Sequence, residues 1–192
     1  MIGSGRNLQS NIKTLSASEI NKIQLQKPSL KLVNSYLEFI AEMKNRGEKI
    51  WELSIPAEAE SPELFIDRLT AEKADPEKSL VPETRYWATI DHQVVGKIGL
   101  RHELNENLAE FGGHIGYEVR PSFRQKGIAK EILKRVLQTP KAKEIGKLLL
   151  TCSPDNIASI KTILSNGGVL TNTAYVEKWQ RYTSYYWINL KT

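Results

Sequence analysis

The stretch GGHIGYEVRPSFRQKGIAKEIL, residues 112–133, decides the fold because a turn containing glycine separates a strand pattern from a helix pattern. Up to Val119 the residues favour an extended strand. After Gly127 the apolar residues recur at three- and four-residue spacing, which predicts an amphipathic helix. Its buried stripe is Ile128, Ile132, Leu133, Val136 and Leu137. The strand therefore gives way to a helix at a glycine.

The same periodicities extend in both directions from this stretch. Strands are predicted at about residues 22–26, 86–90, 94–100, 111–119 and 148–152, with two aromatic-rich strands closing the chain. Helices are predicted from Ser29 to about Gly47, from Ser61 and Pro62 onward, from Gly127 to about Pro140, and from Asn156 to Ser165. This order predicts the α/β (α+β) class, with a central mixed sheet covered by helices on both faces.

Length and composition predict one soluble globular domain. The chain has 192 residues, of which 40% are hydrophobic and 26% are charged. The opening residues 1–20 are rich in Ser, Asn and Gly, and we expect a flexible N-terminal extension there. The single folded domain is expected to span residues 21–192.

Charge and cysteine content narrow the partners and the compartment. The net charge of +5 is spread along the chain, which predicts a mild attraction for anions such as a phosphorylated cofactor. The sequence contains no recognisable nucleic-acid-binding motif. A lone Cys152 excludes an intrachain disulfide and a multi-cysteine metal site, and its apolar neighbours predict a buried, inert thiol. No apolar stretch is long enough to span a bilayer. We expect a cytoplasmic protein that binds neither nucleic acid nor membrane, and the sequence leaves a homodimer open.

The pattern Arg124-x-x-Gly127-x-Ala129 has the chemistry of a pyrophosphate site. The free N–H groups of a turn and a first helical turn converge on an anion, and Gly127 and the small Ala129 allow its close approach. Arg124, Lys126 and Lys130 offer cations nearby. For this short pattern alone, an ordinary loop with a helix-starting glycine is an equally good interpretation.

The wider stretch resembles the acetyl-coenzyme A signature of the GNAT acetyltransferases. The resemblance rests on Tyr117-Glu118-Val119-x-Pro121-x-x-Arg124-x-x-Gly127-x-Ala129. A second segment farther on is also similar, with Asn156 opening a helix, Ser159 within it, and Asn166-Gly167-Gly168 closing it. The resemblance covers about residues 22–190, is closest to a bacterial branch of predicted acetyltransferases, and implies a GNAT fold with acetyl-CoA as cosubstrate and no metal.

The resemblance also implies roles for individual residues. The main chain of Tyr117, Glu118 and Val119 would pair with the pantetheine arm, and the Val119 N–H would stabilise the oxyanion formed when an amine attacks the thioester. The pyrophosphate would be held by Arg124, Gln125, Lys126, Gly127, Ile128, Ala129 and Lys130. Asn156 and Ser159 would reach the cofactor from the next helix, although Asn156 would equally serve as a simple N-cap.

The reaction needs a base, because an amine with a pKa near 10 is mostly protonated at neutral pH. His114 and Glu118 lie four residues apart on one predicted strand and would share a face. We favour His114, since imidazole titrates near neutrality, and keep His102 and Glu103 as further options. Arg101 and His102 are expected to contact the acceptor, with Arg101 holding a carboxylate, although each of these residues would also suit a surface or structural role.

The chain departs from the family pattern at the proton donor. Many GNAT enzymes have a tyrosine seven residues after the asparagine, where this chain has Ile163. The tyrosines of the closing strands could replace it or simply pack in the sheet; they are Tyr175, Tyr182, Tyr185 and Tyr186. We therefore expect direct acetyl transfer to an unidentified amine in a ternary complex, with a non-catalytic coenzyme A-binding module as the alternative.

Overall fold

The computed structural model describes residues 16–75 and 80–190. The predicted N-terminal extension lies outside the described residues as far as residue 15. From Ser16 onward the chain forms helix α1, Ala17–Asn21, which begins with a capping box. The Ser16 hydroxyl accepts the Glu19 N–H at 3.2 Å, and the Glu19 carboxylate accepts the Ser16 N–H at 2.8 Å.

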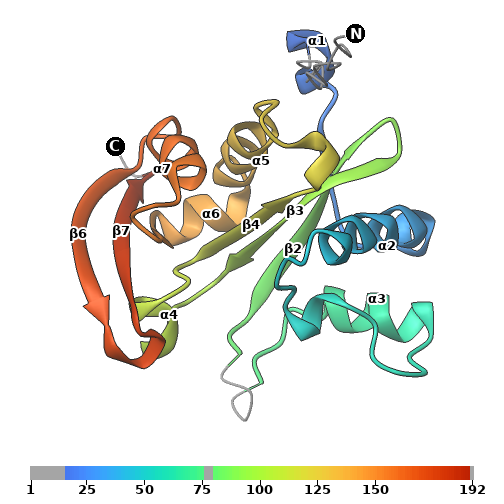
Figure 1. Cartoon of the computed structure of the whole chain (residues 1–192), viewed down its shortest axis with the longest axis horizontal. Coiled ribbons are helices and arrows are strands. Elements are labelled where there is room, and N and C mark those ends of the chain that lie inside the picture. Colours follow the sequence, from blue (N-terminus) through green and yellow to red (C-terminus); the bar gives the residue numbers. More distant parts are fainter. Residues whose placement is uncertain (1–15, 76–79, 191–192) are drawn as a thin grey trace, which may run out of the picture.

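The described residues form strands and helices in an alternating order (Figure 1). The strands are β1 (Gln24–Gln26), β2 (Glu83–Ile90), β3 (Gln93–Arg101), β4 (Ile115–Val119), β5 (Lys147–Cys152), β6 (Val169–Val176) and β7 (Arg181–Asn189). The helices after α1 are α2 (Leu30–Asn45), α3 (Pro62–Thr70), α4 (Glu106–Glu110), α5 (Ile128–Leu137), α6 (Pro140–Ile145) and α7 (Ile157–Leu164). Single 3-10 turns are η1 (Glu52–Ser54), η3 (Pro121–Phe123) and η4 (Glu177–Trp179).

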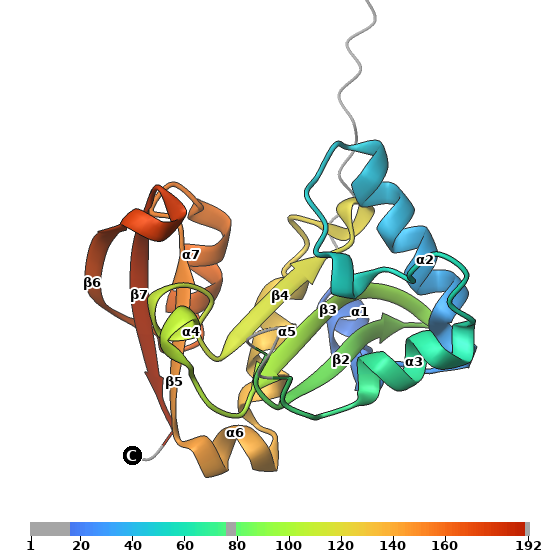
Figure 2. The ribbon, with the colours of Figure 1, turned by 90° about the horizontal axis from the view of Figure 1, so that it is seen from below.

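The strands form two sheets rather than one continuous mixed sheet. One sheet has the order β1-β2-β3-β4, the other has the order β5-β7-β6, and their neighbouring strands pair antiparallel. The sheets meet just before β4, where the His114 N–H donates to the Leu149 carbonyl at 2.7 Å. Away from this junction the strands of the second sheet diverge from β4 (Figure 2). The predicted class, with helices on both faces, is confirmed, but the β-structure is split.

Two hydrophobic cores hold helices on opposite faces of the first sheet. The amphipathic face of α5 packs Ile132, Leu133 and Val136 against one face, together with residues of the second sheet. On the other face α2 and α3 pack around Trp87, whose ring stacks on Tyr36 at 4.3 Å. Because burial of such side chains contributes about 1.5–3 kcal/mol each, these cores fix the positions of β3 and β4.

The segment between β3 and β4 differs from the prediction. The strand predicted at 111–119 begins only at Ile115, because Gly112 and Gly113 have φ of +112° and +62°, values incompatible with a strand. The five-residue helix α4 precedes them, with Asn105 as its N-cap. These two glycines turn the chain so that β4 runs back beside β3.

Candidate active site

The edge of β4 that faces away from β3 is open. The Arg101 N–H donates to the His114 carbonyl at 2.8 Å, and the Arg120 N–H donates to the Val95 carbonyl at 2.9 Å. Since main-chain groups alternate along a strand, the Glu118 peptide groups also face β3, whereas those of Tyr117 and Val119 point to the open edge. No strand of the described chain pairs with that edge. Glu118 is therefore corrected as a main-chain ligand of pantetheine, because its N–H and carbonyl are directed into the β3 ladder.

The loop from Arg124 to Lys130 ends at the N-terminus of α5. Gly127 is the N-cap and has φ of +80°, and Gln125 before it has φ of +60°. Within the described part of the chain, the N–H groups of residues 125–130 have no main-chain or side-chain acceptor. Several unpaired donors at the positive end of a ten-residue helix form a site for an anion.

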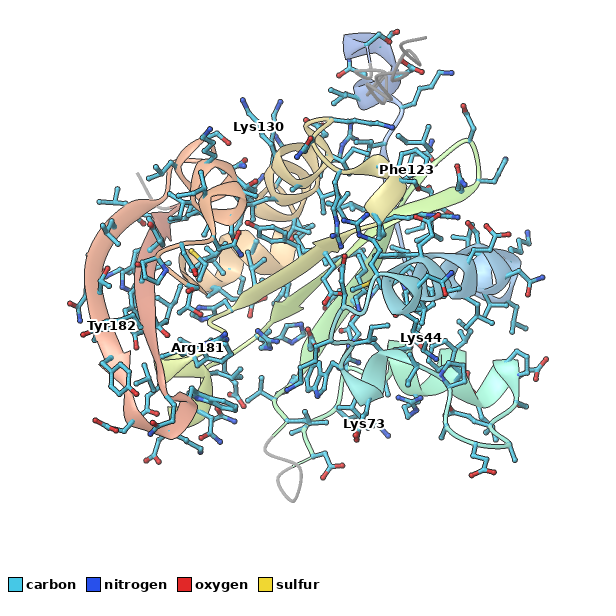
Figure 3. All side chains as sticks on the ribbon, in the orientation of Figure 1. Lys44, Lys73, Phe123, Lys130, Arg181 and Tyr182 are labelled. Atoms are coloured by element: carbon cyan, nitrogen blue, oxygen red, sulfur yellow. The ribbon has the colours of Figure 1, made fainter. Side chains whose placement is uncertain are left out.

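Of the three predicted cations, Arg124 is already engaged. Its guanidinium donates to both carboxylate oxygens of Glu48 at 2.6 Å, and its Nε donates to the Val119 carbonyl at 2.9 Å. The Glu48 hydrogen bonds raise the pKa of Arg124, and those from Arg124 lower the pKa of Glu48. Lys126 donates to the Ser122 carbonyl, while Lys130 extends into solvent from the start of α5 (Figure 3). Arg124 thus fixes the loop, and the two lysines lie at its surface.

Asn156 and Ser159 lie in the first turn of α7, across from β4. The Asn156 side chain accepts the Ser159 N–H at 3.0 Å, so the capping role left open by the sequence is present. The Ser159 hydroxyl is 2.8 Å from the Tyr117 hydroxyl. This bond links β4 to α7, and burial raises the pKa of Tyr117.

His114 is placed as a structural residue. It is 7% exposed, and its Nδ1 accepts the Leu149 N–H at 2.9 Å. Burial, and then the nearby Arg101 cation, lower the pKa of His114 to about 4. The lone pair of its neutral imidazole is thus already used between the two sheets, which makes His114 less suited than Glu118 to the predicted role of base.

A cavity of about 220 Å³ lies on the α2 and α3 face of the first sheet, beside β4. Its charged lining residues are Glu83, Arg85, Lys97, Arg101 and Glu118, with Trp51 at one wall. The Lys97 ammonium lies 2.9 Å from Glu118 Oε2, and the Arg85 guanidinium lies 2.7 Å from Glu83. The Glu118 side chain thus lies in the cavity, and the next residue, Val119, presents its N–H at the open edge.

Arg101 also lines this cavity, whereas His102 does not. The His102 Nε2 lies 2.8 Å from the Thr84 hydroxyl, which in turn donates to Glu72 at 2.9 Å. The structure thus brings together two of the predicted residues, Glu118 and Arg101. It separates both histidines from the cavity.

Comparison with known proteins identifies the family. The sequence profile of the Acetyltransferase (GNAT) family matches residues 47–167, a span that includes the open strand edge, the α5 loop and α7. The chain belongs to the GNAT family of acetyltransferases. It is accordingly an acetyl-CoA-dependent N-acetyltransferase, as the sequence resemblance implied. No curated protein matches it in sequence.

Solved structures share the GNAT fold at low identity. The microcin C7 self-immunity acetyltransferase MccE, solved with acetyl-CoA and AMP, has a TM-score of 0.63 at 17% identity and covers 88% of this chain and 93% of its own. RimL, a ribosomal L7/L12 α-N-protein acetyltransferase solved with coenzyme A, has a TM-score of 0.60 at 14% identity, covering 88% and 94%. The aminoglycoside acetyltransferase AAC(6')-Ib, solved with coenzyme A, has a TM-score of 0.60 at 15% identity, covering 87% and 94%.

Ile163, at the position where the sequence departs from the family pattern, is a core residue. Ile163 is 1% exposed, and a Cβ on Gly168 would overlap its side chain. Cys152 is buried, and burial raises the pKa of its thiol, which disfavours a nucleophilic role.

The tyrosines of the closing strands have other partners. Tyr185 donates to the Glu110 carbonyl at 2.9 Å, Tyr186 is 3% exposed, and Tyr175 and Tyr182 contact each other edge to face. Tyr117 on β4 directs its hydroxyl to Ser159 of α7.

Three charged residues of the cavity were missed from the sequence: Glu83, Arg85 and Lys97. Glu83, Arg85 and Trp87 alternate along β2, so they share one face of the sheet. The two charged residues at alternate positions of a central strand could have predicted a polar cavity on that face of the sheet.

Among the residues that the structure describes, no group of three or more His, Cys, Asp or Glu side chains could hold a metal ion. Nor is any helix of residues 16–75 and 80–190 long and apolar enough to cross a membrane.

Proposed function

We propose that this enzyme transfers the acetyl group of acetyl-CoA directly to a primary amine bound in the cavity beside β4, with Glu118 as the base. The observation that carries the proposal is the position of Val119 between the open strand edge and the cavity. Its N–H points to the open strand edge, while the neighbouring Glu118 side chain lines the cavity. A thioester on one side and an amine on the other would meet there.

The cofactor would bind through main-chain groups. Pantetheine would take the place of a missing strand against the peptide groups of Tyr117 and the N–H of Val119, whose carbonyl already accepts from Arg124. The pyrophosphate would lie on the unpaired N–H groups of residues 125–130. Lys126 and Lys130 would add cations at the rim, and Asn156 and Ser159 would border the arm from α7. Arg124 acts indirectly by holding the loop to Glu48.

The chemical steps follow from these positions. The Glu118 carboxylate, directly or through one water, removes the proton of the ammonium, and the free amine attacks the thioester carbon. The Val119 N–H stabilises the oxyanion, and the C–S bond then breaks. The nitrogen, positively charged after the attack, loses its second proton, and this proton passes through water to the departing thiolate. The acid of that thiolate has a pKa of about 8.5, so no dedicated proton donor is needed. Binding both substrates together supplies much of the rate through proximity.

We place this reaction in a single domain, residues 21–192, and in the cytoplasm, where the lone Cys152 would stay reduced. Thiol release from acetyl-CoA, measured across amines, amino acids, polyamines, aminoglycosides and peptide N-termini, tests the activity. Calorimetry with acetyl-CoA run beside it tests the cofactor site.

Amine-dependent thiol release that falls in Glu118→Gln supports the proposal. Tight acetyl-CoA binding with no release from any amine favours a coenzyme A-binding module. Absence of acetyl-CoA binding refutes the proposed cofactor site.

A further inference from the structure

Arg101 is a cation of the cavity without a carboxylate partner. Its Nη1 donates to the Gly113 carbonyl at 2.9 Å and to the Gly112 carbonyl at 3.3 Å. Within the described residues no carboxylate lies at ion-pair distance from it. Burial lowers the pKa of Arg101, and the nearby Glu83 carboxylate on the paired strand acts in the opposite direction. Its hydrogen-bond acceptors are the two neutral carbonyls, which compensate only in part for lost water.

The floor of the cavity beneath this guanidinium is made by two glycines. Gly99 of β3 and Gly116 of β4 lie opposite each other in the ladder. The Glu83 carboxylate fills the space above Gly99, where a Cβ would overlap its Oε1. Above Gly116 the nearest group is Arg101, whose Nη2 would lie 3.6 Å from an added Cβ. The Gly116 half of the floor is therefore open to a ligand that contacts Arg101.

The charges of the cavity leave one cation in excess. Arg85 pairs with Glu83 and Lys97 pairs with Glu118, so the three cations and two carboxylates sum to +1, carried by Arg101. A partly buried guanidinium favours a carboxylate or phosphate, which it can bind through two parallel N–H groups. The same excess disfavours a polycation.

The reacting centre and this cation are within reach of one small molecule. Gly116 and Val119 are three residues apart, which is about 10 Å along a strand at about 3.3 Å per residue. A cavity of about 220 Å³ is smaller than the roughly 300–1,000 Å³ of sites for drug-sized ligands. An acceptor whose amine lies at Glu118 and whose anion lies at Arg101 therefore needs to span only about 10 Å.

We infer that the acceptor is a small amine that also carries a carboxylate or phosphate within about 10 Å of its nitrogen, as in an amino acid, and that Arg101 binds this anionic group. The inference rests on the proposed acetyl transfer. The carboxylate or phosphate of such an acceptor would lie above Gly116, and its ammonium group would then lie toward Glu118.

Matched pairs of amines test the inference. Tyrosine with tyramine and arginine with agmatine differ by a carboxylate, phosphoethanolamine with ethanolamine differs by a phosphate, and spermidine represents a polycation. We expect kcat/KM to be at least about tenfold higher for the anionic member of a pair, since a charge-assisted hydrogen bond contributes about 1.5–3 kcal/mol. The carboxylate and phosphate pairs show which anion is preferred.

Variants assign the preference to Arg101. In Arg101→Gln the ratio of kcat/KM between the two members of a pair should fall to near one, mainly through KM of the anionic member. Lys143→Gln removes the same charge from the exposed face of α6 and should keep the ratio. A ratio that stays unchanged in Arg101→Gln overturns the assignment.

A second variant covers the case in which Arg101→Gln fails to fold, because that change also removes the bonds to Gly112 and Gly113. Gly116→Ala adds a methyl at ordinary contact distance from Nη2 and leaves Arg101 and its carbonyl bonds in place. It should raise KM for the anionic member at least about fivefold and leave the melting temperature near that of the wild type. Unchanged KM in a folded Gly116→Ala protein contradicts the placement of the anion.

The outcomes separate this inference from the proposed function. If the wild-type protein neither binds acetyl-CoA nor releases thiol with any amine, the proposed function and the inference are both refuted. Thiol release that is fastest with spermidine, or equal within every pair, overturns the inference alone. If acetyl-CoA binds without release, calorimetric titration of tyrosine and tyramine into the coenzyme A complex decides, because binding of tyrosine alone supports the inference and equal binding rejects it.

Discussion

Replacement of Gly127 by glutamate places a negative charge where the cofactor pyrophosphate is expected. Gly127 is the N-cap of α5 and has a left-handed backbone, with φ of +80° and ψ of 0°. An added Cβ would meet only the Ile20 Cδ1 of α1, at 3.4 Å, so the side chain has room. We expect Gly127→Glu to fold and to lose most of its affinity for acetyl-CoA.

Two effects set the magnitude. A non-glycine residue in the left-handed region costs about 1–2 kcal/mol, which lowers the free energy of unfolding and affects binding little. A carboxylate about 5 Å from a phosphate charge costs about 1–3 kcal/mol at an effective dielectric constant of about 80 to 20. With two phosphate charges the low end is about 2 kcal/mol, which corresponds to about a 30-fold rise in Kd.

Calorimetric titration with acetyl-CoA measures this change, and thermal unfolding followed by circular dichroism checks the fold. Gly167→Glu is the matched control, because Gly167 has φ of +82°, has no atom within 4 Å of an added Cβ, and lies at the opposite end of α7 from Asn156. Gly127→Ala carries the backbone strain without the charge. If Gly127→Glu binds acetyl-CoA as tightly as Gly167→Glu does, the pyrophosphate does not lie at the start of α5.

Three further predictions concern groups around this loop and strand. Glu118→Gln should lower kcat about 100-fold, the scale of general base catalysis, and should leave the Kd for acetyl-CoA within about threefold; an unchanged kcat in steady-state assays would remove Glu118 as the base. Arg124→Gln and Glu48→Gln should each raise KM for acetyl-CoA several-fold, because each breaks the same pair; an effect in only one of them would show that the pair is not the cause. His114, near Arg101, has a folded pKa of about 4 against an ordinary value of about 6.5, so the unfolded state takes up the proton first as the pH falls. The wild type should therefore lose about 3 kcal/mol between pH 6.5 and 4 relative to His114→Gln, at about 1.4 kcal/mol per pKa unit, and parallel urea unfolding curves across that range would contradict this.

The parts of the fold and site that the sequence predicted are those made by neighbouring residues. The helix stripe from Ile128 to Leu137 and the glycine that starts it are local features, and both lie where the periodicity put them. The connection between the strands predicted at 86–90 and 94–100 is local as well, although Gln93 already belongs to β3, which leaves Asp91 and His92 as the turn, both with positive φ. Local chemistry decided these elements, so no knowledge of distant contacts was needed.

The parts that were missed depend on residues far apart in the chain. His114 is a structural residue only because Leu149, 35 residues later, donates to its Nδ1. The cavity exists because the registers of β2, β3 and β4 bring Glu83 above Gly99 and Arg101 above Gly116. A strand-by-strand prediction contains the alternation along each strand but lacks the register between strands.

The supports of the cofactor loop connect it to the acceptor side of the molecule. Glu42 of α2 accepts from the Arg120 Nε at 2.7 Å and from the Ser122 N–H at 3.1 Å, and Glu48, just after α2, holds Arg124. The same helix supplies Tyr36 to the wall of the cavity. One helix thus positions both the turn that would bind pyrophosphate and the pocket that would bind the amine. Because close-packed interiors transmit strain, substitutions that loosen the packing of α2 are expected to affect the binding of both substrates.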